Sequence, residues 1–487
     1  MTTQTPKLDI IQARFQQLDF SDLPDWLAGV RTRALTAVMN RGLPDHAWES
    51  WRHTPIQSWL EDILARPLPQ SPLQPQKEAE TNSLSSTAGE ITTADEAPIQ
   101  QTLLPGCHIR CCNGVFSASG DLPNGVELLP QAAFKGDENA PAIVWLQTQT
   151  RQVDPLANLV TAFSSEPALL RISTELHQPI HIWYRAEQER LTLPALLMWL
   201  EENTNATVIE HFAGADNNYT SGINYTSDNN CASHNNYACL NRSDIVLNRN
   251  ARLNYYRLNN DADRSRHIGY LGIEQHSDSQ CDVQVLTTGG GAVRNTLNIE
   301  QTGNGAGSRV KGCAWVTGKH HCDYQLILRH LCDRGQSDAQ LHSLAAGSGT
   351  MVSNGLIHIA RETRDNAAEF QSRNLLLSEQ AQIHTKPELE IYADDVQCSH
   401  GASIGQLDEQ ALFYLRSRGI DLREARHLLL HGFLKNIWHH SGDSAFDDYC
   451  RQLLADGLQT LESEASPSVK NARESAADET TERSTFE

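Results

Sequence analysis

The sequence predicts a mainly β fold with helical segments at both ends, and three observations support this. Between residues 142 and 404, short apolar segments recur about every ten residues and are separated by Gly, Asn and Asp. No proline lies between 195 and 386, although 17 of the 19 prolines lie in residues 1–194. Fifteen Asn fall within residues 203–260, and Asn tolerates the left-handed turn conformation. Since proline removes a ladder donor, continuous sheet is favoured. Examples of the apolar segments are IVWL (143–146), ALLRIS (168–173), TVIEHF (207–212) and QLILRH (325–330).

The strand pattern alone leaves the architecture open. Many short strands with turn residues at regular spacing are typical of a sandwich or a barrel. The same pattern also fits a coil of parallel strands, in which each turn of the coil adds one strand to each sheet.

The N-terminal segment predicts a small helical domain over residues 1–65. Leu27, Val30, Leu35 and Val38 recur at helical spacing, and Trp48 and Trp51 follow. Residues 66–100 are rich in Pro, Ser, Thr and Glu, which predicts a flexible linker. We therefore place the β core at residues 101–404.

The C-terminal segment predicts a helical domain over residues 405–461. Asp408 is a candidate N-cap for a helix that carries Leu412 and Leu415 on one face. In residues 421–438, apolar residues recur at three- and four-residue steps, which predicts an amphipathic helix. This helix either packs on its own domain or docks a partner. Residues 462–487 are predicted to be disordered.

Charge and cysteine use limit the function classes. The formal net charge of −21 disfavours binding to nucleic acid and to anionic membrane. The chain has no apolar run of about 18 residues and no signal-peptide core, so a cytoplasmic location is predicted. The 11 cysteines are then expected to be reduced, and most of them buried as small apolar side chains.

Residues 386–419 contain the densest group of candidate functional side chains in the chain. Asp394, Asp395, Cys398 and His400 lie within seven positions, and Gly401 follows. The alternation of Leu389 and Ile391 with polar neighbours predicts a strand. Positions i and i+2 of a strand share one face, so Cys398 and His400 are expected side by side as possible metal ligands. The chain has no P-loop, G-x-S-x-G or HExxH motif, and no enzyme activity is predicted.

This block resembles the signature of the SufB/SufD family of iron–sulfur cluster assembly scaffold proteins, and it favours the SufD branch. The resemblance extends to most of residues 10–440, through segments 42–56, 201–214, 248–258, 290–297 and 373–420. It implies a right-handed parallel β-helix core flanked by N- and C-terminal helical segments. Two departures from the family are a longer 66–100 linker and an apparent insertion at 217–239.

The resemblance also implies partners. These are a SufB-like scaffold subunit and a SufC-like ABC-type ATPase, with no nucleic acid and no membrane. His400 is expected to face the scaffold subunit, with Cys398 beside it. Iron or a nascent iron–sulfur cluster is then expected at that subunit interface, with His400 as a ligand and none held by the isolated chain. Leu429, Phe433 and Ile437 are the expected docking residues for the ATPase.

Two other interpretations remain open at this point. Glu390, Asp394 and Asp395 could serve a polysaccharide-active enzyme, because other β-helix proteins carry carboxylates on one face. The chain could also be a purely structural subunit with no ligand role.

Overall fold

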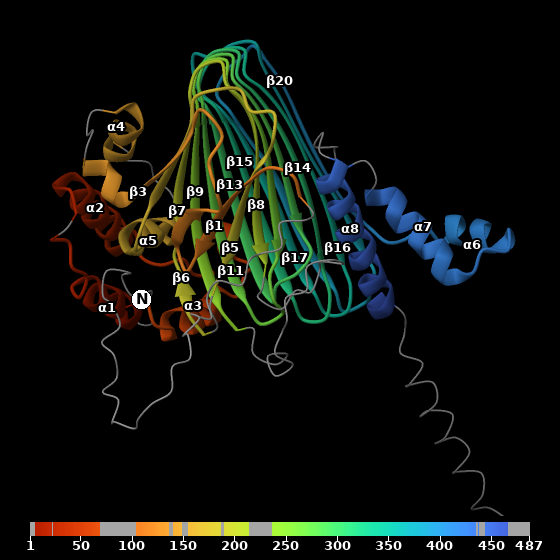
Figure 1. Ribbon diagram of the computed structural model, residues 1–487. Helices are drawn as coiled ribbons and strands as arrows, with labels where there is room; N and C mark the ends of the chain where they lie inside the picture. The colour runs from red at the N-terminus through yellow and green to blue at the C-terminus, as the bar shows by residue number, and fades with distance from the viewer. Residues whose placement is uncertain are drawn as a thin grey trace, which may run out of the picture.

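The computed structural model describes residues 5–21, 23–68, 104–135, 140–148, 154–186, 189–213, 236–434, 437 and 444–465. Most of the predicted linker, the larger part of the 217–239 segment and residues 466–487 lie outside these ranges. A tall stack of strands forms the centre of the molecule, with N-terminal helices on one side and C-terminal helices on the other (Figure 1).

The strands form two sheets. Sheet A has the order β2-β1-β5-β8-β10-β12-β14-β16-β18-β20, and sheet B has the order β19-β17-β15-β13-β11-β9-β7-β4-β3, with β6 also paired to β9. The strand bounds are β1 Cys107–Cys112, β2 Val115–Ala118, β3 Val126–Pro130, β4 Ala168–Ile172, β5 Ile180–Arg185, β6 Leu191–Thr192, β7 Ala195–Leu200, β8 Asn205–Ala213, β9 Ala238–Leu247, β10 Arg252–Asn260, β11 Arg266–Gln275, β12 Gln280–Thr287, β13 Ala292–Gln301, β14 Gly307–Val316, β15 His321–His330, β16 Gln336–Ala345, β17 Thr350–Ile359, β18 Asn366–Leu376, β19 Gln382–Ile391 and β20 Val396–Gly405.

From β8 onward, successive strands alternate between the two sheets and pair only in parallel with the strands of neighbouring coils. This confirms the parallel β-helix prediction over the sandwich and the barrel. Side chains of both sheets that point inward form one continuous core, which includes Tyr255, Leu271 and Phe370.

A column of left-handed residues turns one corner of each coil. Asn250, Asp278, Gly305, Arg334 and Asp365 all have φ between 57° and 76°. Each donates its backbone N–H to a carbonyl of the next coil, at 2.9 to 3.0 Å. The ladder hydrogen bonds therefore continue through the corner, and this accounts for the Asn, Asp and Gly that punctuate the sequence.

One predicted strand is a helix. Residues 143–146 lie within α4 (Pro141–Thr148), where Ile143 is buried against Leu197 and Trp199 of sheet B. A short apolar run fits a strand and a buried helix equally well, and Pro141 suits the first turn of a helix.

The N-terminal helices cover the outer face of sheet B (Figure 1). They are α1 (Thr5–Phe15), α2 (Asp25–Arg41), η1 (Glu49–Trp51) and α3 (Ile56–Ala65), joined further along by η2 (Gln131–Lys135) and α5 (Pro155–Phe163). Buried contacts anchor them: the Arg294 guanidinium lies 3.5 Å from the Trp51 ring centroid, and Thr54 donates to Asp323 at 2.5 Å.

The C-terminal helices are α6 (Glu409–Ser417), α7 (Leu422–Leu434) and α8 (Ser444–Ala465). Asp408 caps α6, as predicted, by accepting from the backbone N–H groups of Gln410 and Ala411. Helix α8 packs on the outer face of sheet A, with Phe446 against Tyr256. Helix α6 extends away from the strands, and the C-terminal end of α7 packs on sheet A through Phe433 and His342 (Figure 1). The predicted 421–438 helix ends at Leu434.

Candidate functional site

Strand β20 places Cys398 and His400 at the open end of the solenoid. Cys398 pairs with Ala368 and His400 with Phe370, and both partners are buried residues that point inward. Within the described residues no strand follows β20 in sheet A, so the two side chains lie at the end of the core, and Cys398 packs against it. Cys398 is half-buried and His400 is exposed. The register therefore puts Cys398 and His400 on the same face of β20, with the His400 side chain accessible.

Two side chains cannot complete a metal site alone. Within the described residues, no group of three or more His, Cys, Asp or Glu lies close enough to hold a metal ion. Burial raises the pKa of Cys398, so its thiol carries a proton at neutral pH. Any iron held here would need further ligands from another molecule and the loss of that proton.

The nearby carboxylates lie outside this end face. Glu390 points away from the core and accepts from His358 Nδ1 at 3.1 Å. Asp394 and Asp395 form the exposed turn before β20, where the Asp395 carbonyl accepts from Asp365. Glu390 therefore has a partner on the outer face, which gives a polysaccharide-active carboxylate site no support.

The expected docking residues are partly used by the chain itself. Ile437 is 1% exposed, and Phe433 packs on His342 with ring centroids 4.8 Å apart. Leu429 is half-buried. The exposed apolar residues of this region are instead Phe413, Tyr414, Leu422 and Leu428. We call these four the α6–α7 patch.

Sequence reasoning missed the α6–α7 patch, although it contained a signal. Leu412 is buried, and residues one and two positions further along a helix cannot share its face. Phe413 and Tyr414 therefore had to point elsewhere, and Phe413 is 74% exposed. A large exposed aromatic side chain next to further exposed apolar residues is typical of an interaction surface.

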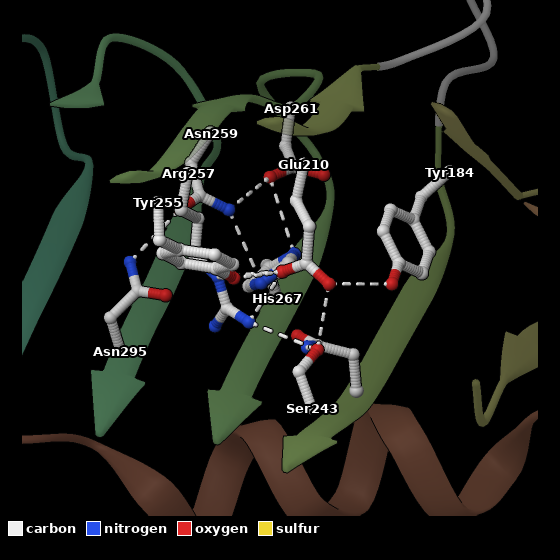
Figure 2. Close-up of polar contacts among 10 residues, drawn as sticks. Tyr184, Glu210, Ser243, Tyr255, Arg257, Asn259, Asp261, His267 and Asn295 are labelled. Atoms are coloured by element: carbon white, nitrogen blue, oxygen red, sulfur yellow. Dashed lines mark hydrogen bonds and ion pairs between the residues drawn. The ribbon is translucent and has the colours of Figure 1, made fainter. Parts of the chain in front are cut away.

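The sequence analysis also did not predict the polar cluster inside the solenoid (Figure 2). At its centre, Glu210 pairs with Arg257 at 2.7 Å, and both side chains are fully buried. Glu210 also accepts from Tyr184 at 2.7 Å, from Ser243 at 2.8 Å and from Tyr255. Hydrogen bonds to all sides of this carboxylate offset the cost of burying its charge.

A second buried ion pair lies beside the first (Figure 2). His267 Nδ1 is 3.3 Å from Asp261 Oδ2, and Tyr237 donates to Asp261 Oδ1 at 2.6 Å. Burial opposes a charge on His267, but Asp261 outweighs it and raises the pKa of His267 to about 9. His267 also holds the pKa of Asp261 below its ordinary value, against the effect of burial. Both groups are charged at neutral pH.

The cysteines largely follow the sequence prediction. Seven of those in the described residues are buried, Cys107 and Cys398 are half-buried, and Cys112 is exposed. Cys231 lies outside the described ranges. Burial raises the pKa of Cys313 to about 12, so that thiol is unreactive in its ordinary state.

Comparison with known proteins places the chain. Residues 183–433 match the profile of the SufBD core domain, described as SUF system FeS cluster assembly. SufD of Escherichia coli is 24% identical over 416 residues, which cover 83% of this chain and 86% of that protein. A SufBD family protein of Synechocystis is 28% identical over 74% of this chain and 80% of its own length. SufD of Bacillus subtilis is 28% identical over 40% of this chain and 45% of its own. None of the helices in the described ranges has the length and apolar character needed to cross a membrane.

Proposed function

The chain belongs to the SufB/SufD family of SUF-system iron–sulfur cluster assembly proteins, with SufD-type relatives, and on that premise we propose that it is a non-enzymatic SufD-like subunit of a scaffold complex. Its partners in this proposal are a SufB-like scaffold subunit and a SufC-like ABC-type ATPase. It would work in the cytoplasm, where thiols stay reduced. The observation that carries the proposal is the pair formed by half-buried Cys398 and exposed His400 on β20, the last strand of sheet A in a SufBD core.

The open end of the solenoid is the proposed contact with the scaffold subunit. Its inward row combines His400 with the exposed apolar residues Ile391 and Ile404. Within the part of the chain that the structure describes, one edge of β20 has no strand beside it, and a row of unpaired backbone groups favours pairing with another chain. Iron or a nascent cluster would enter as cargo between the subunits, with His400 and Cys398 as two of its ligands and the scaffold subunit supplying the others.

The α6–α7 patch is the proposed contact with the ATPase. It extends away from the β body, so a partner can reach it without disturbing the core (Figure 1). Nucleotide-driven movement of the ATPase would be passed through α7 and α8 to sheet A. Since Phe433 and Ile437 already pack on the chain's own core, we assign docking to the patch and the anchoring of α7 to these two residues.

The test is His400→Ala in the co-expressed complex. We expect normal assembly and thermal stability, because the side chain is exposed, together with reduced cluster formation per folded complex. His358→Ala is the matched control, since His358 lies near the same end but points outward to Glu390. Cluster absorbance and complex mass should be measured on one preparation. Cluster yield equal to that of the control would overturn the ligand role of His400 and leave family membership intact.

A further inference from the structure

A cavity of about 170 Å³ lies where α8 meets three successive corners of the solenoid. The corners follow β10, β12 and β14, and Leu453 and Gly457 of α8 complete the wall. The backbone of α8 lies directly on the Trp315 ring at this point, because a Cβ at position 457 would overlap that ring. A cavity of about 150 Å³ holds a molecule of the size of benzene. The space is therefore large enough for a small organic ligand.

One wall of the cavity is a glycine turn with unused backbone donors. Gly289 and Gly290 follow β12, and Gly290 is buried with a φ of 100°. The flanking residues of the turn, Thr288 and Gly291, donate their N–H groups to carbonyls of the preceding coil. Among the described residues, no acceptor is found for the N–H groups of Gly289 and Gly290. A buried backbone donor requires a partner, and successive N–H groups in a turn form a concavity that suits an anionic group.

The rim of the cavity carries a carboxylate that can still accept hydrogen bonds. The Asp263 side chain is 83% exposed, and its Oδ1 lies 3.8 Å from His320 Nε2, which is too long for a hydrogen bond. The other carboxylate of the lining, Asp261, is already satisfied by Tyr237 and His267. The described residues of the lining include no Lys or Arg. A multiply charged anion would therefore lack a cation here, whereas a ligand with its own ammonium group finds a counter-ion in Asp263.

The inner part of the cavity is apolar. Its buried side chains there are Trp315, Val316, Cys322 and Leu453. Small-molecule sites typically combine such an apolar wall with a few polar groups that set the orientation of the ligand. The cavity thus offers separate places for an anionic group, a cationic group and an apolar group.

We propose that this cavity binds a free α-amino acid with a small apolar side chain. The ligand carboxylate accepts from the N–H groups of Gly289 and Gly290, and its ammonium group donates to Asp263. The apolar side chain lies against Trp315 and Leu453. An α-amino acid carries both charges near neutral pH, so each charge has a partner. Because the ligand contacts α8 as well as the corners, binding holds α8 on sheet A. This inference does not depend on the proposed partner subunits.

The test is isothermal titration calorimetry of L-leucine into the purified full-length chain. Three further probes each lack one feature: L-leucinamide lacks the carboxylate, 4-methylpentanoate lacks the ammonium group, and glycine lacks the apolar side chain. Inorganic phosphate tests for a simple anion site. We expect L-leucine to bind at least about tenfold more tightly than each of the other four. Absence of L-leucine binding at millimolar concentration, or equal binding of any of the other probes, would overturn the proposal.

Two variants assign the binding to this cavity. Asp263→Asn should weaken L-leucine severalfold and leave 4-methylpentanoate unchanged, because only L-leucine has an ammonium group. Asp121→Asn is the matched control, since Asp121 is an exposed aspartate outside the cavity. Thr317→Phe places a larger side chain in the lining and should abolish L-leucine binding. Circular dichroism melts identify any variant that fails to fold. L-leucine affinity equal to that of the control in both folded variants would rule out this cavity as the site.

Hydrogen exchange gives a second readout that does not rely on a variant. Leu453 and Gly457 of α8 line the cavity, whereas no residue of α6 does. Saturating L-leucine should therefore slow the exchange of α8 amides and leave those of α6 unchanged. If exchange in α8 stays the same at saturation, L-leucine does not bind against this helix and the proposal is wrong.

Discussion

At the scale of single residues, the interior of this solenoid depends on shape as much as on charge. The Arg257 guanidinium reaches across from sheet A to the backbone of Gly269 in sheet B, between the amide oxygens of Asn241 and Asn295. A Cβ at position 269 would lie 2.8 Å from Asn241 Oδ1 and 3.0 Å from Arg257 Nη1. Glycine inside a strand thus makes room for a buried cation.

Gly269→Ala should therefore destabilise the protein, by about 1–3 kcal/mol, because the added methyl group displaces Arg257 from Glu210 in a packed interior. Urea unfolding followed by circular dichroism measures the change. Gly432→Ala in α7 is the control: its Cβ meets nothing within 4 Å, and alanine favours a helix. An equal loss of stability in both variants would show that the space left by the missing side chain of Gly269 does not contribute to stability.

The buried histidines make stability depend on pH. Burial lowers the pKa of His181, His321 and His342 to about 4 in each case. The unfolded chain binds these protons at higher pH than the folded chain does. Stability should therefore fall as the pH drops from about 6.5 to about 4, by up to about 3 kcal/mol per histidine. His267 acts in the opposite sense, since its contribution is lost as the pH rises through about 9.

His342→Gln tests this dependence at one position. His342 donates to the Phe433 carbonyl at 3.0 Å, and a glutamine amide can keep that hydrogen bond without titrating. Urea unfolding over the acid range should show a smaller loss of stability for the variant than for the wild type. If the two curves stay parallel, His342 does not contribute to the acid sensitivity.

At the scale of elements, α6 and α7 both pack on the chain itself and expose an apolar surface to a partner, and these two contacts need different faces of the helices. The inner side of α7 carries Ala425, Leu430 and Leu434, which are buried. The α6–α7 patch lies on other faces and remains exposed. Anchoring and docking therefore rest on different residues, and substitutions can separate them.

Phe413→Glu should abolish co-purification of the ATPase subunit and leave thermal stability unchanged, because the ring is 74% exposed in the free chain. Pull-down from co-expression and a melting curve give the two measurements. Leu331→Glu is the matched control, an exposed apolar residue at a corner of the solenoid. If the Phe413→Glu variant still co-purifies with the ATPase, Phe413 is not part of the docking surface.

At the scale of the whole molecule, the succession of strands could be predicted from the sequence, whereas the polar contacts inside the solenoid could not. Proline placement and corner residues such as Asn250 and Gly305 follow from the backbone, so they mark the coils in sequence. Glu210 and Arg257 are 47 positions apart in sequence, and neither carries a local sign that it is buried. In the same way, strand alternation predicts that Cys398 and His400 share a face but not that β20 is the last strand of its sheet.

The faces and the end of the β body differ in what they offer a partner. N-terminal helices cover sheet B and α8 covers sheet A (Figure 1). Within the described residues, no strand lies beyond β19 and β20, which end the two sheets. Exposed Ile391 and Ile404 flank this end, 38% and 46% accessible. Burying them in a complex would release water from apolar surface on both chains.

Ile404→Glu should therefore remove the scaffold subunit from the complex while the ATPase subunit stays bound, the reverse of the result expected for Phe413→Glu. Strand β20 carries no Lys or Arg that could pair with a carboxylate at this position. The desolvation of that carboxylate on binding costs more than the lost apolar contact. Light scattering of the co-expressed complex gives the subunit composition. Leu331→Glu again serves as the control for an added surface charge. If Ile404→Glu retains the scaffold subunit, or if both subunits leave together, the open end is not a separate interface, and the division of the molecule into two docking regions is wrong.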